Sequence, residues 1–474
     1  MKKAGIGIAV ATALVLATLP AVLGIMTEQR VRARIEAMQE GTLTARLLSY
    51  ERGWLASRAR IELTLSPRYL AEIQALDPAT PPPDAAAPDQ RATLLVEFMH
   101  GPVAIGGGGV FFGLSKTVAR LDPESDGVGE LERRLGVPYL FEFRGRTGFL
   151  GRTAFDADLP PIHLPLAGTT LDFSGATVSG VLRGQHLTSN LELGSIAFST
   201  PSGAFGLRNL AGSIDSEIRS RYGVPGTLEL KLEHALIADA DVRTPLFELE
   251  NLNATSRATL DPTGAQLEMQ MTYSVDALRA EGMAFADIDL GVALHKIDMD
   301  AMKAYFDNTS LLSEGRDSPE RAAMLAALSP QVARALAASP SLVLNPVRFT
   351  LNNEPFDAHA ELTTDPAALP PPGAFDIEDP GLWLAVVKSQ ATIKISKLLA
   401  KQLAVVAVQT RLANDMRLPP EQLHPLAEAQ AGLVLAALAG QGMLRNDGDS
   451  YLSDIEVADG LLTVNGRPLP LGLR

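Results

Sequence analysis

Apolar and polar residues alternate in several separated stretches of the chain. Such a period of two is expected where one face of a strand is buried and the other is wet. The clearest stretches are residues 60–65, 227–232, 247–250, 266–271 and 347–351. Because the pattern returns so often, it predicts long antiparallel sheets.

Turn signals separate these stretches. Residues 261–264 (Asp-Pro-Thr-Gly) predict a tight connection, because proline presets one turn dihedral and glycine accepts positive φ. Residues 221–226 have a similar composition. Near the end, Asp459-Gly460 and Asn465-Gly466 are favoured two-residue turns, so residues 451–470 predict a β-hairpin that closes a sheet edge and is needed for folding.

Helical patterns are found in the last third of the chain. Residues 319–338 are rich in alanine and leucine, and Pro330 is expected to break them into two short helices. Residues 395–412 and 419–440 predict two further helices. The apolar run at 429–439 is too short to span a membrane and is read as a buried helix. We expect these helices to pack as a layer on the sheet.

The N-terminal segment has a different pattern. No residue from Ala4 to Thr27 is charged, and a helix of that length spans a hydrocarbon core of roughly 30 Å. The stretch is longer than the apolar core of a signal peptide and lacks a convincing cleavage site. We therefore expect a retained transmembrane helix, followed at residues 27–39 by a charged helical stalk.

These patterns together predict an α+β, β-rich fold. It combines an N-terminal transmembrane helix, long antiparallel sheets and a helical layer in the C-terminal third. The expected organisation is an anchor at residues 1–27, a β-rich periplasmic region at 28–300, and an α+β periplasmic region at 301–474 that ends in a β-hairpin. The expected location is the bacterial inner membrane, single-pass, with the bulk in the periplasm.

Composition narrows the possible partners and chemistry. Acidic residues outnumber basic ones by 55 to 41, and a net charge of -14 argues against a nucleic-acid partner. The absence of cysteine excludes disulfides, thiolate nucleophiles and cysteine zinc sites. The partners left open are the inner membrane through residues 4–27, lipid, and another envelope protein.

Three separated stretches resemble one bacterial family. They are residues 49–57 with Tyr50, Arg52, Gly53 and Trp54; the His-Gly-Pro of residues 100–102; and the end of the chain, with Tyr451, Asn465 and Gly466. In this order they resemble the YdgA-like proteins, over nearly the whole chain. The resemblance implies a membrane-anchored envelope protein of unassigned function, and brings no catalytic residues.

We interpret the first of these stretches, residues 49–57, as a structural corner and call it the early motif. Gly53 is expected to adopt a backbone conformation closed to other residues, and Trp54, which could also be a binding aromatic, is expected to pack in the core. On this reading Trp54→Ala lowers stability.

Candidate catalytic and metal-binding motifs are incomplete. The glycine-rich residues 106–117 fail the phosphate-loop pattern, because no lysine directly follows the last glycine. The seven histidines include no i,i+4 pair, and the cluster of Asp447, Asp449 and Asp454 lacks the glutamate of a calcium loop. There is no Gly-x-Ser-x-Gly elbow. No catalytic, cofactor-binding or metal-binding residue is therefore assigned.

Two classes of function remain. The first is a non-enzymatic envelope factor that shields hydrophobic ligands such as lipids against a curved sheet, or serves as an interaction scaffold. The second is a periplasmic hydrolase whose site is assembled from distant residues. A continuous apolar groove would favour the first, and titratable residues converging in a cleft would favour the second.

Overall fold

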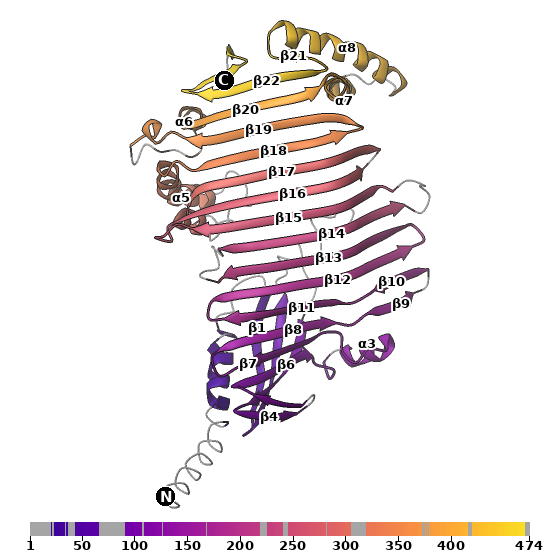
Figure 1. Ribbon diagram of the computed structural model, residues 1–474, viewed down its shortest axis with the longest axis vertical. Coiled ribbons are helices and arrows are strands. Elements are labelled where there is room, and N and C mark those ends of the chain that lie inside the picture. Colours follow the sequence, from indigo (N-terminus) through magenta and orange to yellow (C-terminus); the bar gives the residue numbers. More distant parts are fainter. Residues whose placement is uncertain are drawn as a thin grey trace, which may run out of the picture. The chain divides into compact units, whose positions relative to one another are not determined.

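The structure is a computed structural model with two compact units, Met1–Pro201 and Ser202–Arg474. It describes residues 20, 23–33, 35–36, 43–65, 91–106, 109–125, 127–166, 168–218, 225–239, 245–280, 282–304, 319–371, 375, 377, 379–415 and 420–469. The boundary expected near residue 300 falls just after a strand inside the second unit. Figure 1 shows both units and labels many of their elements.

The first unit is an antiparallel sheet. Its elements are β1 (Leu43–Arg52), β2 (Ala56–Leu65), β3 (Arg91–His100), β4 (Val103–Gly106), β5 (Gly109–Phe112), β6 (Ser115–Leu121), α3 (Val128–Leu135), β7 (Glu142–Thr147), β8 (Arg152–Leu159), β9 (Ile162–Leu166), β10 (Thr169–Phe173), β11 (Ala176–Arg183) and β12 (His186–Thr200). Neighbouring strands follow the order β1-β2-β3-β6-β7-β8-β11-β12. β10 pairs with the later part of β12, along the same edge as β11, and β9 pairs with β10; β4 and β5 form a separate hairpin.

The core of the first unit lies on one face of β2, β3 and β6. Ala59, Val96, Phe98 and Ala119 form its buried cluster, and register pairs Ala59 with Val96 and Val96 with Ala119. The helix described at residues 23–33 and 35–36 packs Val31 against this cluster. The alternating pattern at residues 60–65 is thus a strand with one packed face, as predicted.

The second unit is a meander of longer antiparallel strands. Its elements are β13 (Gly203–Glu217), β14 (Gly226–Asp239), β15 (Phe247–Leu260), β16 (Gln266–Ala280), β17 (Met283–Asp298), α5 (Pro319–Ala337), β18 (Ser341–Leu351), β19 (Glu354–Thr364), η1 (Pro366–Ala368), α6 (Pro380–Val386), β20 (Val387–Ser396), α7 (Lys397–Asp415), α8 (Pro420–Gly440), β21 (Arg445–Asp447), β22 (Ser450–Ala458), β23 (Leu461–Val464) and β24 (Arg467–Leu469). Strands from β13 to β20 pair consecutively, and β22 then pairs with β20 on one side and with β21 and β23 on the other.

The predicted turns of the second unit are confirmed where they are described. Asp261 closes the β15–β16 turn by accepting hydrogen bonds from the amides of Thr263 and Gln266 and from the Thr263 hydroxyl, and these bonds lower the pKa of Asp261 to about 2. The closing hairpin forms as expected, with positive φ at Asp459 and Asn465. Of the expected turn at 221–226, residues 221–224 lie outside the described residues.

The helices lie at the ends of the strands, so the expected helical layer over the sheet is wrong (Figure 1). The segment 319–338 forms one helix that contains Pro330 instead of two. α7 and α8 pack on each other through Val405, Leu412, Leu423, Ala427 and Ala431. Because α8 buries only this stripe, Leu433 is 71% exposed, and the expectation of a buried helix at 429–439 is also wrong.

The predicted transmembrane helix at residues 1–27 is not supported. No helix among the residues that the structure describes is both long and apolar enough to span a bilayer. The helix described at residues 23–33 and 35–36 carries charges from Glu28 onward, and it is not a solvated stalk, because Val31 and Ile35 pack inward. Residues 1–19 lie outside the described residues.

Candidate functional site

One face of the second unit's sheet is apolar across successive strands. Paired residues of antiparallel neighbours share a face, so the register defines rows of side chains that cross the sheet. One row is Leu230, Ala254, Tyr273, Leu290, Val347, Ala358, Ile393 and Ser453. The next row on this face is Leu228, Ser256, Met271, Val292, Leu344, Ala360, Ala391, Ile455 and Val464. We call these two rows the apolar face.

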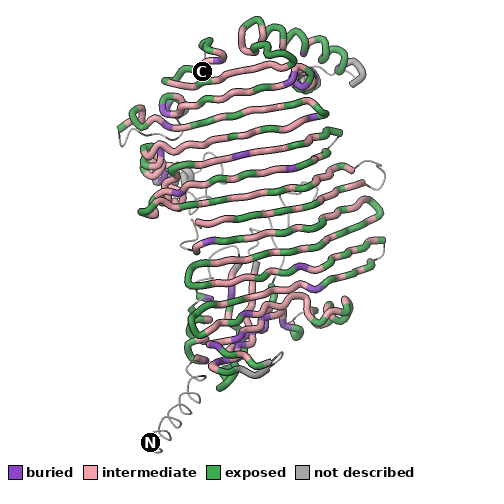
Figure 2. The backbone as a smooth tube through the Cα atoms, viewed as in Figure 1, coloured by how far each residue is buried: buried purple, intermediate pink, exposed green. Residues whose placement is uncertain are grey.

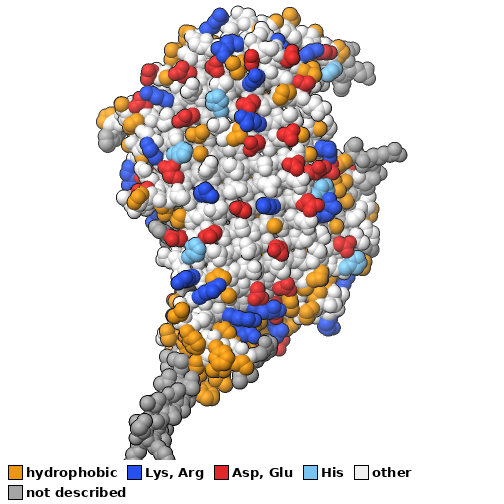
Figure 3. Space-filling model, viewed as in Figure 1, with side chains coloured by type: hydrophobic (Ala, Val, Ile, Leu, Met, Phe, Trp, Pro, Cys, Tyr) orange, Lys and Arg blue, Asp and Glu red, His pale blue; other side chains and the backbone are white. Residues whose placement is uncertain are grey.

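The opposite face is polar. A row between the two above consists of Glu229, Thr255, Thr272 and Gly291, and a neighbouring row of Lys231, Asn253, Ser274, Asp289, Arg348, Asp357 and Lys394. Charged side chains of both signs are scattered over the face drawn in Figure 3. The two faces therefore differ sharply in polarity, because the alternation predicted from the sequence is kept in register from strand to strand.

The apolar face is not a closed core. Of its residues only Val464 is buried, the rest are half-buried or exposed, and Leu228 is 46% exposed. Figure 2 shows the same half-buried character along the middle strands. Within the described part of this unit, the buried clusters lie in α7–α8 and around α5, η1 and α6, away from the strand centres. Apolar surface of this extent is typical of a binding surface.

A charged cluster bounds the apolar face at one end. Register places His234 opposite Glu250 and Glu248 opposite Arg279. The Arg279 guanidinium donates to Glu248 at 2.6 Å and to Glu250 at 3.2 Å, and hydrogen bonds from Arg279 and His234 lower the pKa of Glu248. Farther along β14, β15 and β16, ion-paired groups thus replace the apolar residues.

A serine–histidine pair lies in the first unit. The Ser57 hydroxyl on β2 is 2.8 Å from Nε2 of His100 on β3, and both side chains are buried. Burial lowers the pKa of His100, and its Nδ1 has no hydrogen-bond partner. A pocket of about 480 Å³ has Ser57 in its lining but not His100. Its other lining residues include Arg58, Glu97 and Met99, which alternate with the core positions and so lie on the opposite face of the sheet. The pair has a nucleophile and a base, without the third group that orients the base in a catalytic triad.

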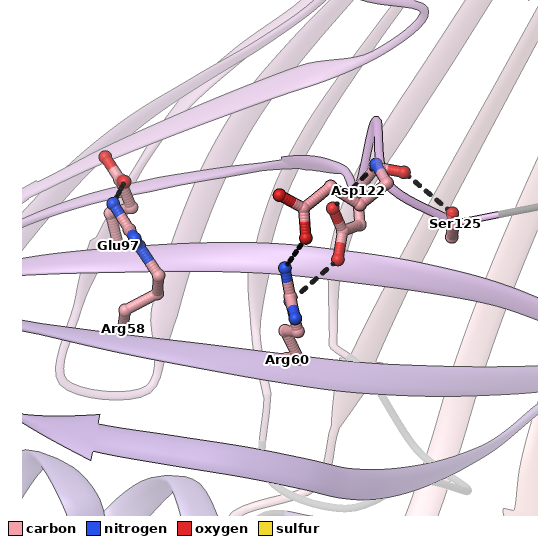
Figure 4. A network of polar contacts seen from close by, with 6 residues as sticks. Arg58, Arg60, Glu97, Asp122 and Ser125 are labelled. Carbon is pink, nitrogen blue, oxygen red and sulfur yellow. Dashed lines mark hydrogen bonds and ion pairs between the residues drawn. The ribbon is translucent and has the colours of Figure 1, made fainter. Parts of the chain in front are cut away.

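The charged residues near this pocket form a structural network on the other face of the sheet (Figure 4). Arg58 pairs with Glu97 at 2.8 Å, and Arg60 pairs with Asp122 at 2.9 Å. The Ser125 hydroxyl donates to the Asp122 carbonyl at 2.7 Å. Because each cation is met by a carboxylate, this network ties β2 to β3 and to the segment after β6.

The early motif residues do not form one packed corner. Tyr50 stacks on Phe98 with ring centroids 6.4 Å apart. A Cβ on Gly53 would lie 2.3 Å from the Ala56 carbonyl oxygen, so only glycine fits there. Arg52 pairs with Glu28 at 3.5 Å. Trp54 is 56% exposed, and the expectation that it packs in the core is wrong, because it lies at the tip of the β1–β2 turn.

Asn465 and Gly466, from the C-terminal stretch that resembles the family, stabilise the closing hairpin. Asn465 Nδ2 donates to the carbonyls of Gly442 and Met443, at 2.8 and 3.0 Å. Its Oδ1 accepts from the Asp454 amide at 3.0 Å. Asn465 and Gly466 have φ of 49° and 75°, as a two-residue hairpin turn requires. The structural role of the motif residues stays a prediction until variants are measured.

Two of the three clustered aspartates and two of the histidines lie against groups of opposite charge or a carboxylate. Asp447 pairs with Lys394 and Asp454 with Arg445, each at 2.8 Å. His163 and His295 each lie against a single carboxylate. Within the described ranges, no group of three His, Asp or Glu side chains is placed to hold a metal ion.

Sequence reasoning named Ser57 and His100 in separate motifs without pairing them. The two residues are 43 positions apart, and only the β2–β3 register brings them together. The alternation of apolar and polar residues within each strand indicated an apolar face. No single stretch indicates that the rows continue across so many strands.

Comparison with known proteins places the chain in one family. The model of "Bacterial protein of unknown function (DUF945)" matches residues 1–472. Comparison with curated proteins gave no match, and comparison with solved structures gave none. The family match confirms the expectation of a bacterial family without an assigned activity; the YdgA-like resemblance stays a prediction.

Proposed function

The chain belongs to DUF945, a bacterial family of unknown function, and we propose that it is a non-enzymatic lipid-handling protein. In this proposal the apolar face of the second unit holds the acyl chains of a lipid. The supporting observation is the continuity of that face. Its rows cross the strands from β14 to β22 at about 4.8 Å per spacing, a length of roughly 34 Å.

The chemistry of the face favours acyl chains over a polar ligand. Neither row contains a charged residue, and the only hydrogen-bonding side chains in them are Tyr273, Ser256 and Ser453, so a polar ligand would lose its hydration and gain few partners. An acyl chain reaches about half of a hydrocarbon core of roughly 30 Å, so the rows are long enough to hold one across several strands. Covering half-exposed leucine, methionine and valine side chains is favourable by about 25 cal/mol per Å² of apolar surface.

The test places a charge on one face at a time. Met271 lies on the apolar face, and its neighbour Thr272 points to the polar face. We expect Met271→Lys to weaken binding of a fluorescent phospholipid by about tenfold or more, because the ammonium would have to be desolvated beside the acyl chain. Thr272→Lys is the matched control and should bind as the wild type does. Thermal melting of both variants checks that the fold is kept.

Two results would contradict this proposal. One is equal lipid binding by wild type and Met271→Lys at equal stability. The other is a purified protein that binds no phospholipid or fatty-acid probe while Met271→Lys still abolishes capture of a protein partner. That second result would favour the interaction scaffold instead.

A hydrolase is the second candidate, supported by the Ser57–His100 pair. Its weakness is the missing partner at His100 Nδ1, since a triad needs a group that orients the base. A fluorophosphonate probe tests it directly. Labelling that is lost in Ser57→Ala and absent after heat denaturation would establish a reactive serine, whereas an unlabelled chain would remove this candidate.

The location in the bacterial envelope is also a proposal. It is supported by the uncharged stretch from Ala4 to Thr27 in the sequence. Reporter fusions placed after residue 39 should be active only with a reporter that needs the periplasm. Activity of a reporter that works only in the cytoplasm would refute this location.

A further inference from the structure

Three connections between strands meet at one end of the first unit. They are the β1–β2 turn at residues 53–55, the β3–β6 connection at 101–114 with its β4–β5 hairpin, and the β7–β8 turn at 148–151. The His100 amide donates to the Leu55 carbonyl and the Leu114 amide to the Thr147 carbonyl, each at 2.8 Å. Backbone hydrogen bonds therefore hold the three connections side by side.

These connections expose large apolar side chains. They are Trp54, Leu55, Val110, Phe112, Phe149 and Leu150, which we call the tip surface. Phe112 is 68% exposed and Leu150 is 98% exposed. Figure 3 shows hydrophobic atoms gathered at this end of the unit. Exposed aromatic and leucine side chains in such a group cost solubility, which points to a contact surface.

The charges around the tip surface are mostly of one sign. The three connections contain no charged residue. Within two residues of them along the strands lie the exposed basic residues Arg52, Arg146 and Arg152 and the acidic residue Glu51, whereas Lys116 is buried. Arg52 is also paired with Glu28 at 3.5 Å. The apolar tip is thus flanked by basic side chains, chiefly Arg146 and Arg152, which we call the basic collar.

We propose that the tip surface enters the interfacial layer of a bilayer that contains anionic phospholipids. Tryptophan, phenylalanine and leucine are the side chains favoured at that depth, and the basic collar would lie at the level of the anionic headgroups. A second copy of this surface fits less well, because the two basic collars would face each other. This inference does not depend on the apolar face of the second unit.

The two tryptophans of the chain permit a local measurement. Trp54 lies in the tip surface, whereas Trp383 is half-buried on α6 and donates from its indole to the Ile377 carbonyl at 2.9 Å. The full chain with Trp383→Phe reports on Trp54 alone, and the full chain with Trp54→Phe reports on Trp383 alone. This local readout is needed because the apolar N-terminal residues could hold the chain on vesicles by themselves.

The expected result is specific to Trp54. With vesicles of phosphatidylethanolamine and phosphatidylglycerol, its emission should shift to the blue and be quenched by lipids brominated on their acyl chains. The emission of Trp383 should not change. Phe149→Ser with Leu150→Ser should reduce the vesicle affinity of the Trp54 signal by about tenfold or more. Leu433→Ser with Val434→Ser, on α8, is the matched control for exposed apolar residues and should leave it unchanged.

Other outcomes would overturn the inference. If the emission maximum of Trp54 did not change with vesicles but shifted with protein concentration, the tip surface would be assigned to self-association. Equal quenching with phosphatidylcholine alone, insensitive to salt and to Arg146→Gln with Arg152→Gln, would refute the role of the basic collar. No shift and no quenching under any condition would refute membrane contact altogether.

Discussion

Replacing Asn465 by alanine should destabilise the second unit, because this side chain joins the closing hairpin to the segment after α8. It donates to Gly442 and Met443 and accepts from the Asp454 amide. It also adopts a φ of 49°, a conformation that alanine enters at a cost. The substitution therefore removes three hydrogen bonds and adds backbone strain.

The size of the effect follows from these contacts. Three part-buried hydrogen bonds contribute about 1 kcal/mol each, and the left-handed conformation costs alanine about 1 kcal/mol more. The expected loss is about 4 kcal/mol in the free energy of unfolding. For a unit spanning Ser202–Arg474 this corresponds to a fall in Tm of about 7 °C.

The assay is thermal unfolding followed by circular dichroism, with two controls that separate the contributions. Asn465→Gly keeps the positive φ and should cost about 3 kcal/mol, the hydrogen bonds alone. Asp459→Ala, in the neighbouring turn with a φ of 53°, should cost about 1 kcal/mol. Hydrogen exchange should become faster at Asp454 in Asn465→Ala, because its amide loses its acceptor.

Equal stability of Asn465→Ala and Asp459→Ala would refute this reasoning. It would mean that the three side-chain bonds add nothing to stability and that only turn strain is felt. A loss of stability in Asn465→Gly but not in Asn465→Ala would also contradict this reasoning, since glycine accepts the positive φ and alanine does not.

Three further predictions concern the rest of the chain. Trp54→Ala should leave the free energy of unfolding within about 0.5 kcal/mol of wild type, because the side chain is exposed; a larger loss in urea unfolding would restore the packed-core reading. Burial lowers the pKa of His100, so the unfolded chain takes up a proton more readily than the folded one. Stability should therefore decline as pH falls below about 6.5, and His100→Gln should flatten that decline in unfolding curves measured against pH. Deleting residues after Ala458 removes the strand that covers the edge of β22, so the truncated chain should sediment as aggregate; a soluble, equally heat-resistant product would show the hairpin to be an appendage.

Local structure was largely readable from the sequence. The alternating stretches are strands, and the turns at 261–264, 459–460 and 465–466 form as expected, because turn chemistry depends on neighbouring residues. Pro330 shows the limit of such reasoning, since it lies within one continuous helix. A proline removes one backbone donor and disfavours a helix, but it does not force a break.

Exposure was the least predictable property. Trp54 and Leu433 were expected to be buried, and both are exposed. An apolar residue in a turn or on a helix has the same local pattern whether or not a partner element covers it. Only the placement of the other elements decides this, and here the helices lie at the strand ends and the β1–β2 turn lies at a sheet end.

The sequence by itself determined which residues of each strand share a face, because side chains alternate along an extended backbone whatever its neighbours are. It also determined the turns at 261–264, 459–460 and 465–466. Only the tertiary structure decided that Met271, Val292 and Leu344 lie in one row, that Ser57 meets His100, and that three uncharged connections meet at one end of a sheet. Those features depend on strand order and register, which arise from contacts between segments far apart in the chain and leave no mark in any single stretch.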